Sequence, residues 1–234
     1  MPLFPGLIAV AAMSCAPGAP AGGGEDFDTA RERMVVEQIE ARGVKDALTL
    51  AALRKVGRHL FVPESALQDA YRDHPLPIGH GQTISQPYIV GFMTEALKLK
   101  GGEKVLEVGT GSGYQAAVLA EIAAQVFTIE IVEALATEAR QRLVGLGYRS
   151  VQVRAGDGYA GWPEEAPFDG IMVTAAAPSV PEPLKRQLKD GGRLILPLGD
   201  EFQELVVVTR KGERFIETRV LAVRFVPMTG KVRE

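Results

Sequence analysis

The feature that most constrains the fold of this chain is an alternation of strand-like and helix-like segments that begins near residue 104. Short apolar runs bounded by turn residues predict buried strands at 104–108, 126–130, 151–155, 168–173 and 192–198. Apolar residues at helical spacing between these runs predict helices at 114–124, 133–146 and 181–188. Strands and helices that alternate in this way form parallel βαβ units with helices on both faces of the sheet. The sequence therefore predicts an α/β fold with a doubly wound, mostly parallel, Rossmann-like sheet.

Helices and one polar loop precede this core. Apolar residues at helical spacing predict a helix at 27–42, ended by Gly43, and further helices at 46–56 and 88–99. The segment GHGQTISQPY, residues 79–88, leads into the last of these helices. A stretch this rich in glycine and small polar residues is typical of a surface loop. We therefore expect an N-terminal helical extension that ends in an exposed loop.

The chain closes with two further strand-like runs. Residues 204–210 and 214–226 lie on either side of a Lys-Gly turn and predict an antiparallel hairpin. We expect residues 26–234 to form a single domain. Within it, 26–100 would supply the helical extension and the polar loop, and 101–234 the α/β core and the hairpin.

Residues 1–25 are expected to lie outside the domain. An apolar run at 7–13 precedes Cys15, the only cysteine of the chain, and a Pro/Gly/Ala-rich linker follows it. The AMSC sequence resembles the lipobox of bacterial lipoproteins, which predicts export and lipid modification at Cys15. However, no Lys or Arg precedes Arg31, so the positive segment of an export signal is absent. A disordered tail or a misplaced start is the alternative interpretation.

Composition and charge exclude several classes of function. The 234 residues carry a net charge of −3, so we expect no nucleic-acid partner, which would require a basic face. No apolar run approaches the ~20 residues that span a bilayer. The three histidines and single cysteine do not have the spacing of metal ligands, so no metal site is expected.

A glycine-rich turn follows the first predicted strand of the core. It reads GTGSGY, with Gly109, Gly111 and Gly113 in alternate positions and Glu107 two residues before the first. A dinucleotide fingerprint would place its third glycine at the position of Tyr114, and the Gly-Lys-Ser/Thr ending of a phosphate-binding loop is also absent. The E-x-G-x-G-x-G pattern resembles instead the first motif of S-adenosylmethionine-dependent methyltransferases. A tight connection without a ligand is the alternative.

This resemblance implies a binding site for S-adenosylmethionine at the carboxyl ends of the strands. The residues of the turn that it assigns to the cofactor are Glu107, Gly109, Thr110, Gly111 and Gly113. Glu130, at the end of the second core strand, is placed to accept hydrogen bonds from the ribose hydroxyls, and Asp157 and Gly158 to contact the adenine. Glu130 as a solvated strand end, and Asp157-Gly158 as an ordinary turn, are the alternatives.

The segment after the fourth core strand, VTAAAPSVP at 173–181, bears on the methyl acceptor. It contains no Asn/Asp-Pro-Pro-aromatic motif, which adenine or amide methylation would favour. The only cysteine lies in the N-terminal tail, so a cysteine nucleophile for pyrimidine methylation is also missing. Three alanines supply space but no base. This suits an acceptor such as a carboxylate, which is ionised at neutral pH because its pKa is ~4.

Taken over nearly the whole predicted domain, the sequence resembles the protein-L-isoaspartate O-methyltransferase family. The segments that carry the resemblance are RHLFVP (58–63), GHGQTISQPY (79–88), VLEVGTGSGYQ (105–115), GDGY (156–159), FDGIMVTAAAP (168–178), GGRLILPLG (191–199) and VRFVPMTG (223–230). The resemblance implies a repair enzyme that methylates the free α-carboxylate of L-isoaspartyl residues in damaged proteins and peptides. It also implies a cytoplasmic location, with export through Cys15 as the alternative, and we expect a monomer.

The family resemblance also assigns site residues in the polar loop. Ser85 would be the active-site residue, with Thr83, Ile84 and Gln86 flanking the cofactor and the substrate. Thr229 would make a weaker contact with the cofactor. A helix N-cap is the alternative role for Ser85. Two other functions remain open, namely a methyltransferase for another carboxylate or a small molecule, and a cofactor-binding protein without catalysis.

Overall fold

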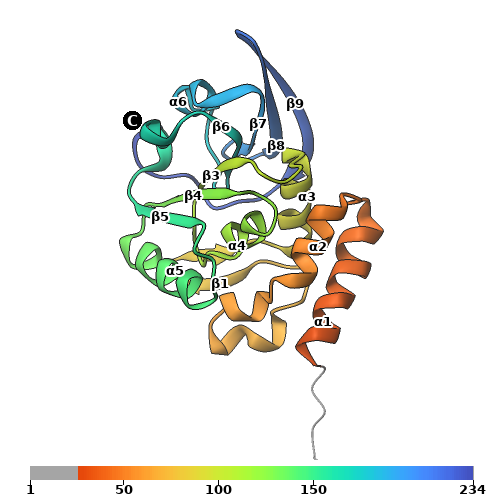
Figure 1. Cartoon of the computed structure of the whole chain (residues 1–234). Helices are drawn as coiled ribbons and strands as arrows, with labels where there is room; N and C mark the ends of the chain where they lie inside the picture. Colours follow the sequence, from red (N-terminus) through yellow and green to blue (C-terminus); the bar gives the residue numbers. More distant parts are fainter. Residues whose placement is uncertain (1–25, 234) are drawn as a thin grey trace, which may run out of the picture.

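The computed structural model describes residues 26–233, so the tail with Cys15 lies outside the described residues. Within this range a central sheet has the strand order β5-β4-β3-β6-β7-β8-β9 (Figure 1). Its strands are β3 (Lys104–Val108), β4 (Gln125–Glu130), β5 (Val151–Ala155), β6 (Phe168–Val173), β7 (Leu188–Leu198), β8 (Gln203–Lys211) and β9 (Arg214–Val223). Strands β3 to β7 pair in parallel, whereas β8 and β9 are antiparallel. The predicted doubly wound sheet and C-terminal hairpin are confirmed.

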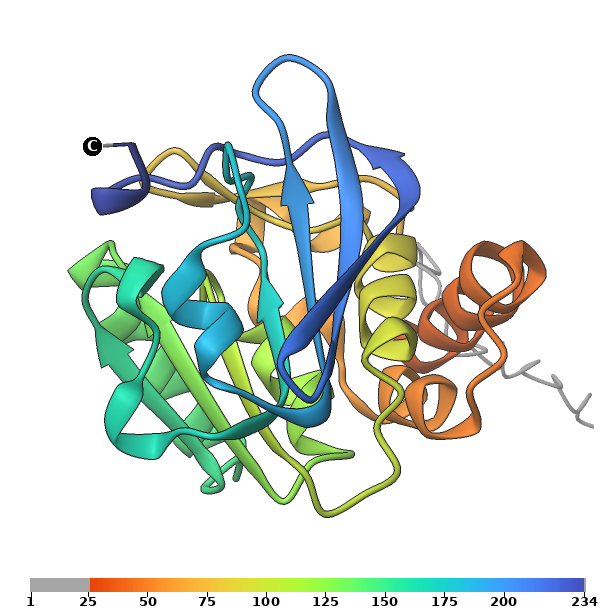
Figure 2. The ribbon, with the colours of Figure 1, turned by 90° about the horizontal axis from the view of Figure 1, so that it is seen from above.

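Apolar residues cover both faces of this sheet. On one face, Val105 of β3 and Val126 of β4 share a buried cluster with the N-terminal helices. The helices α3 (Pro87–Leu97), α4 (Tyr114–Ala120) and α5 (Glu133–Gly145) contribute to the same cluster. On the other face, Leu106 and Phe127 pack with α6 (Glu182–Arg186). Figure 2 shows the yellow helix α3 and the N-terminal helices on one side of the strands and the blue helix α6 on the other. Successive strand residues point to opposite faces, so each strand joins both layers.

The N-terminal extension packs directly on the core. Its first helix starts as α1 (Phe27–Arg33), continues through a π-helical segment (Met34–Ile39) and a 3-10 turn (Glu40–Arg42), and ends at Gly43 with a φ of 101°. A left-handed residue at a helix end favours glycine, as the sequence predicts. The second helix, α2, follows at Ala47–Lys55. Met34, Val35 and Ile39 are fully buried in the cluster that also contains core strand residues.

The polar loop before α3 contains secondary structure that the sequence did not predict. It forms a two-stranded ribbon of β1 (Leu76–Gly79) and β2 (Gln82–Ile84), with His80 and Gly81 in the left-handed region at its turn. Leu76 and Ile84 pair across the ribbon and are both buried. Leu76, Ile78 and Ile84 are the only apolar residues in this run of polar and turn residues. The alternation of apolar and polar residues that is typical of a strand therefore cannot be recognised in the sequence.

Helix and strand ends also differ from the predicted ranges. Helix α4 ends at Ala120 instead of residue 124, because the amide of Ala124 donates a 2.9 Å hydrogen bond to the carbonyl of Glu103 and the chain turns away. Strand β7 begins at Leu188, four residues earlier than predicted. None of the helices among the described residues is long and apolar enough to cross a membrane.

Candidate active site

A pocket lies at the carboxyl ends of the parallel strands, and we call it the inner pocket. Its floor is formed by residues that end β3, β4 and β6, and its cover by the β2 ribbon and the C-terminal segment. The lining residues are Gln82, Thr83, Val108, Gly109, Gly111, Ile129, Glu130, Ile131, Gly158, Thr174, Ala175, Val226, Pro227, Met228 and Thr229. Ligands of open α/β sheets bind at this edge, because the loops that follow neighbouring strands converge there.

Two glycines of the turn, Gly109 and Gly111, line this pocket, and Gly109 has no space for a side chain. Gly109 has a φ of 100°, and a Cβ added to it would lie 2.2 Å from the Thr174 hydroxyl oxygen. That hydroxyl donates a 2.7 Å hydrogen bond to the Gly109 carbonyl, so β3 and β6 are joined just before the pocket. Gly111 also has a positive φ and exposes its backbone to the pocket. At these two positions the turn therefore offers backbone to a ligand.

Glu130 is held rigidly at the edge of the inner pocket. One carboxylate oxygen accepts a hydrogen bond from the amide of Gly111 at 2.8 Å, and the other from the amide of Val132 at 2.9 Å. The side chain is almost fully buried but lines the pocket. A carboxylate has about four lone-pair sites, so two remain for a ligand. This arrangement suits the acceptance of hydrogen bonds from two hydroxyl groups.

Glu107 lies behind the glycine turn and does not line the inner pocket. It is fully buried, and burial raises its pKa to about 8. One oxygen accepts a 2.5 Å hydrogen bond from the Thr128 hydroxyl, which lies 2.6 Å from the Thr110 hydroxyl. Glu107 thus supports the turn through two threonines. Gly113 is likewise packed away, where it begins α4 against Leu143.

Asp157 and Gly158 are neighbours in sequence, but only Gly158 lines the inner pocket. The Asp157 carboxylate accepts hydrogen bonds from the amides of Tyr159 at 2.9 Å and Lys231 at 2.8 Å, and it does not line the inner pocket. Gly158 does line it, and a Cβ there would lie 2.3 Å from Val108. Asp157 therefore ties the C-terminal segment, which includes the pocket residue Thr229, to the sheet edge.

A second, outer pocket adjoins the inner one. Its lining residues are Arg42, Pro75, Thr83, Ser85, Gln86, Tyr88, Ile89, Thr174, Leu221, Ala222, Val223, Arg224, Phe225 and Val226. Thr83, Thr174 and Val226 line both pockets. A small hollow lined by Thr83, Ile84, Ser85 and the glycine turn, including Thr110, shares Thr83 and Thr174 with both pockets. The structure thus brings the predicted loop residues and the glycine turn together, although they are more than twenty residues apart in sequence.

The Ser85 hydroxyl does not cap the helix that follows it. Helix α3 begins at Pro87 with Gln86 at the N-cap position, and no side chain at that position forms a capping hydrogen bond. Instead, Asp73 accepts a 3.2 Å hydrogen bond from the amide of Tyr88. Ser85 has no hydrogen-bond partner within residues 26–233, and its side chain is left to the outer pocket and the hollow.

Sequence reasoning missed Thr174 and Arg42, which line the site, and Asp73, which holds residues of its wall. Thr174 could have been found, because it is the first residue after a predicted strand and therefore lies at the ligand-binding edge. Arg42 and Asp73 gave no signal, since each is a single charged residue in a segment with no motif. Of the alanines at 175–177, only Ala175 lines the inner pocket, and the other two are fully buried.

The fold and the site together define a class I, Rossmann-like methyltransferase, with a glycine turn after the first core strand and a held carboxylate after the second. The family model described as protein-L-isoaspartate(D-aspartate) O-methyltransferase matches residues 29–233. This chain belongs to the protein-L-isoaspartate O-methyltransferase family.

Relatives and solved structures agree with this membership. The chain is 59% identical over 213 residues to protein-L-isoaspartate O-methyltransferase 2 of Shewanella sediminis, covering 90% of this chain and 87% of that one. It is 56% identical over 207 residues to protein-L-isoaspartate O-methyltransferase 1 of Syntrophobacter fumaroxidans, covering 88% and 97%. One solved protein-L-isoaspartate O-methyltransferase has a TM-score of 0.79 at 31% identity, covering 86% of this chain and 67% of that chain.

A further solved structure was obtained with a bound molecule. It is a Plasmodium falciparum protein described as a protein-L-isoaspartate O-methyltransferase in complex with S-adenosyl-L-homocysteine. It superposes with a TM-score of 0.73 at 25% identity, covering 88% of this chain and 99% of that one.

Proposed function

We propose that this chain transfers a methyl group from S-adenosylmethionine to the free α-carboxylate of L-isoaspartyl residues in damaged proteins and peptides. The observation that carries the proposal is the charge of the outer pocket. Among its lining residues in the described part of the chain there is no Asp, Glu or His, and the charged groups are Arg224 and Arg42, of which Arg42 is paired with Asp73 behind the pocket. Such a pocket attracts an anion and offers no general base. It therefore suits an acceptor that is already ionised.

The inner pocket fits the proposed cofactor. Gly109 and Gly111 line it with backbone atoms, and Glu130 presents a fixed carboxylate to accept hydrogen bonds from the ribose hydroxyls. Bound there, S-adenosylmethionine would supply a methyl group attached to a positively charged sulfur. The other residues proposed to touch it are Thr83, Ile84, Thr110, Gly158 and Thr229, whereas Gln86 lines only the outer pocket and is proposed to flank the acceptor.

Three residues expected to touch the cofactor are proposed instead to act from behind the pocket. Glu107 would hold the threonines beneath the glycine turn, Gly113 would start α4, and Asp157 would fix the C-terminal segment over the pocket. Each of them makes its contacts with protein groups and is absent from the inner pocket lining.

On the acceptor side, the protein has to position the carboxylate, and it does not have to remove a proton from it. The Ser85 hydroxyl would donate a hydrogen bond to one carboxylate oxygen of the acceptor. This bond would orient the other carboxylate oxygen toward the inner pocket. Because the acceptor is ionised at neutral pH, positioning supplies the acceleration. Thr83 and Thr174 line both pockets and so lie where the two adjoin. We place the reaction in the cytoplasm, where S-adenosylmethionine is supplied.

The test compares two peptides that differ in one linkage. Labelled S-adenosylmethionine is incubated with the protein and with a peptide that contains either isoaspartate or ordinary aspartate. Base-labile label on the isoaspartyl peptide alone is the expected result. Label on neither peptide, together with intact binding of S-adenosyl-L-homocysteine, would contradict the proposal and favour another acceptor or binding without catalysis.

A further inference from the structure

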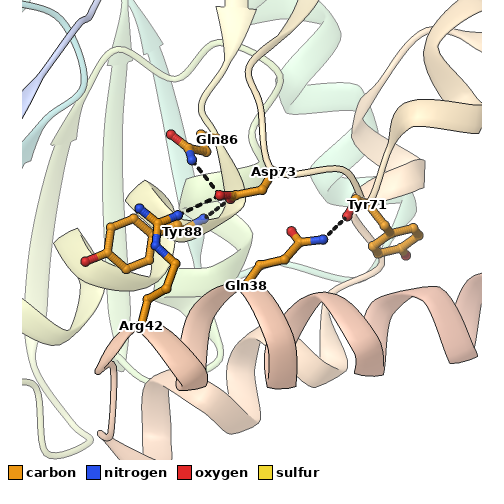
Figure 3. Close-up of polar contacts among 6 residues, drawn as sticks. All are labelled: Gln38, Arg42, Tyr71, Asp73, Gln86 and Tyr88. Atoms are coloured by element: carbon orange, nitrogen blue, oxygen red, sulfur yellow. Dashed lines mark hydrogen bonds and ion pairs between the residues drawn. The ribbon is translucent and has the colours of Figure 1, made fainter.

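We infer that Asp73 is a positioning residue. It holds in place the two-residue link Ser85-Gln86, which joins β2 to α3, and the side chain of Arg42, which lines the outer pocket. The inference rests on the proposed function, because it concerns the residue proposed to orient the acceptor. Figure 3 shows Asp73 at the meeting point of side chains from the N-terminal extension and from the start of α3. Asp73 itself is not among the residues that line either pocket.

Ser85 needs an external support because its link is short and makes few contacts. Ser85 and Gln86 lie between the end of β2 at Ile84 and the start of α3 at Pro87. On the β2 side, the pairing of Leu76 with Ile84 fixes the chain. The Ser85 side chain contributes nothing, since it has no hydrogen-bond partner within residues 26–233. The other side of the link therefore depends on what holds the first residues of α3.

Asp73 supplies that hold with both of its carboxylate oxygens. One oxygen accepts a 2.7 Å hydrogen bond from the Gln86 side-chain amide, and the other accepts a 3.2 Å hydrogen bond from the amide of Tyr88. Pro87 has no N–H to offer, and α3 lacks a capping side chain of its own. A carboxylate at this end of an 11-residue helix is also favoured by the helix dipole. Asp73 therefore caps α3 from 15 residues upstream.

Arg42 connects the same carboxylate to the N-terminal extension. Its guanidinium lies 2.6 Å from the Asp73 oxygen that also binds Gln86, and 3.4 Å above the centre of the Tyr88 ring. Gln38, one turn earlier, donates a 2.9 Å hydrogen bond to the Tyr71 carbonyl, which holds the backbone that leads to Asp73 (Figure 3). Arg42, Gln86 and Tyr88 all line the outer pocket. One half-buried carboxylate thus contacts three residues that line this pocket.

Loss of the carboxylate would release these groups together. Gln86 and Arg42 would be free to turn, the first turn of α3 would lose its cap, and Ser85 would no longer be held at one position. Catalysis by positioning is sensitive to displacements of about 1 Å, which can lower a rate by about 100-fold. None of Arg42, Asp73 and Gln86 lines the inner pocket, so binding of the cofactor should not change.

The experiment measures turnover of the isoaspartyl peptide by Asp73→Ala and Asp73→Asn. We expect kcat to fall about 10- to 100-fold for Asp73→Ala and less for Asp73→Asn, whose amide oxygen can still accept from Tyr88. The dissociation constant for S-adenosyl-L-homocysteine should stay within about twofold, since the positioning acts on the acceptor side. The matched control is Asp69→Ala, because the Asp69 side chain is 41% exposed and forms its ion pair with Arg72. It should retain full turnover.

A double-mutant cycle with Arg42→Met separates positioning from general destabilisation. If both residues act through one arrangement, Arg42→Met combined with Asp73→Ala should lower kcat no further than Asp73→Ala alone. Arg42→Met also tests the inference if Asp73→Ala does not fold. Wild-type kcat in Asp73→Ala, additive losses in the cycle, or a loss matched by weaker S-adenosyl-L-homocysteine binding would each overturn it. An inactive wild-type protein would instead refute the proposed function, and this inference with it.

Discussion

The two glutamates at the ends of neighbouring strands show how the backbone assigns roles to chemically identical side chains. Glu107 of β3 points into the buried layer, and Glu130 of β4 points toward the inner pocket. Two backbone amides hold Glu130 at the pocket edge, whereas one threonine hydroxyl meets the buried Glu107. The same functional group therefore serves as a proposed ligand contact in one place and as a structural support in the other.

The raised pKa of Glu107 predicts how stability changes with pH. In the unfolded chain its pKa has the usual value of 4.5, and in the folded chain burial raises it to about 8. The folded protein thus binds more protons in this window, so Glu107 makes stability decline as pH rises from 4.5 to about 8. Glu107→Gln should remove this part of the decline and unfold at higher urea than the wild type at pH 8. An unchanged pH profile of the urea midpoint would argue against the raised pKa.

Ser85→Ala tests the proposed hydrogen bond to the acceptor. We expect turnover of the isoaspartyl peptide to fall about 10- to 1000-fold, the scale of losing a positioning or charge-stabilising hydrogen bond. Affinity for S-adenosyl-L-homocysteine should be unchanged. Ser65→Ala, at an exposed position outside both pockets, is the control. Full activity of Ser85→Ala would remove Ser85 from the reaction.

Glu130→Ala tests the proposed ribose contact. Hydrogen bonds to a charged group contribute about 1.5–3 kcal/mol, so we expect affinity for S-adenosyl-L-homocysteine to fall about 10- to 150-fold in calorimetry. Glu133→Ala, three residues further on and exposed, should bind as the wild type does. Equal affinities of the two variants would show that Glu130 does not touch the ligand.

At the scale of elements, one turn joins three strands and the pocket. The loop after β3 packs against the first residue after β6, where Thr174 bonds to two β3-end carbonyls at 3.1 Å and 2.7 Å. Later in the same loop, the amide of Gly111 donates a hydrogen bond to the carboxylate of Glu130, the last residue of β4. The turn is therefore both the ligand surface and the connection that holds the carboxyl ends of the strands in register.

Gly109→Ala should disturb this connection strongly. The added Cβ would lie 2.2 Å from the Thr174 hydroxyl, and the φ of 100° is itself strained for alanine. We expect the free energy of unfolding, measured by urea titration, to fall by about 1–3 kcal/mol. Gly145→Ala is the matched control, since nothing lies within 4 Å of its added Cβ at the end of α5. It should gain about 0.5–1 kcal/mol, and equal effects at both glycines would contradict the steric argument.

At the scale of the whole molecule, the N-terminal extension and the sheet share one apolar layer. Met34 and Ile39 belong to the same buried cluster as Val105 and Val126 of the central strands. Gly91 of α3 lies so close to the extension that a Cβ there would be 2.8 Å from Ile39. Contacts this close favour unfolding of the described chain in a single step.

Ligand binding should therefore stabilise the entire chain. S-adenosyl-L-homocysteine at about 100 times its dissociation constant should add about 2.7 kcal/mol, which raises Tm by about 5–10 °C for a chain of this size. Both the extension and the core should melt together in a calorimetric scan, and Glu130→Ala should lose most of the shift at the same ligand concentration. Two separate transitions, of which only one moves, would contradict a single cooperative unit.

The local pattern of residues in the sequence was sufficient to predict the strands of the core and the positions of the glycines in the turn. The strands at 104–108, 151–155 and 168–173 have the predicted ends, because a buried parallel strand is a continuous apolar run between turn residues. Glycines at left-handed positions, such as Gly43 and Gly109, follow from the steric limits on a single residue. These features depend on neighbours along the chain, so the sequence alone determines them.

Only the tertiary structure decided which polar side chains face the pockets and what holds them. Asp73 meets Arg42 across 31 residues and Gln86 across 13, and Thr174 meets Gly109 across 65. Hydrogen bonds of this kind depend on distances between segments that are unrelated in sequence, and no local periodicity records them. The burial of Glu107 has the same origin, because whether a strand residue faces a ligand or a helix depends on what packs over it.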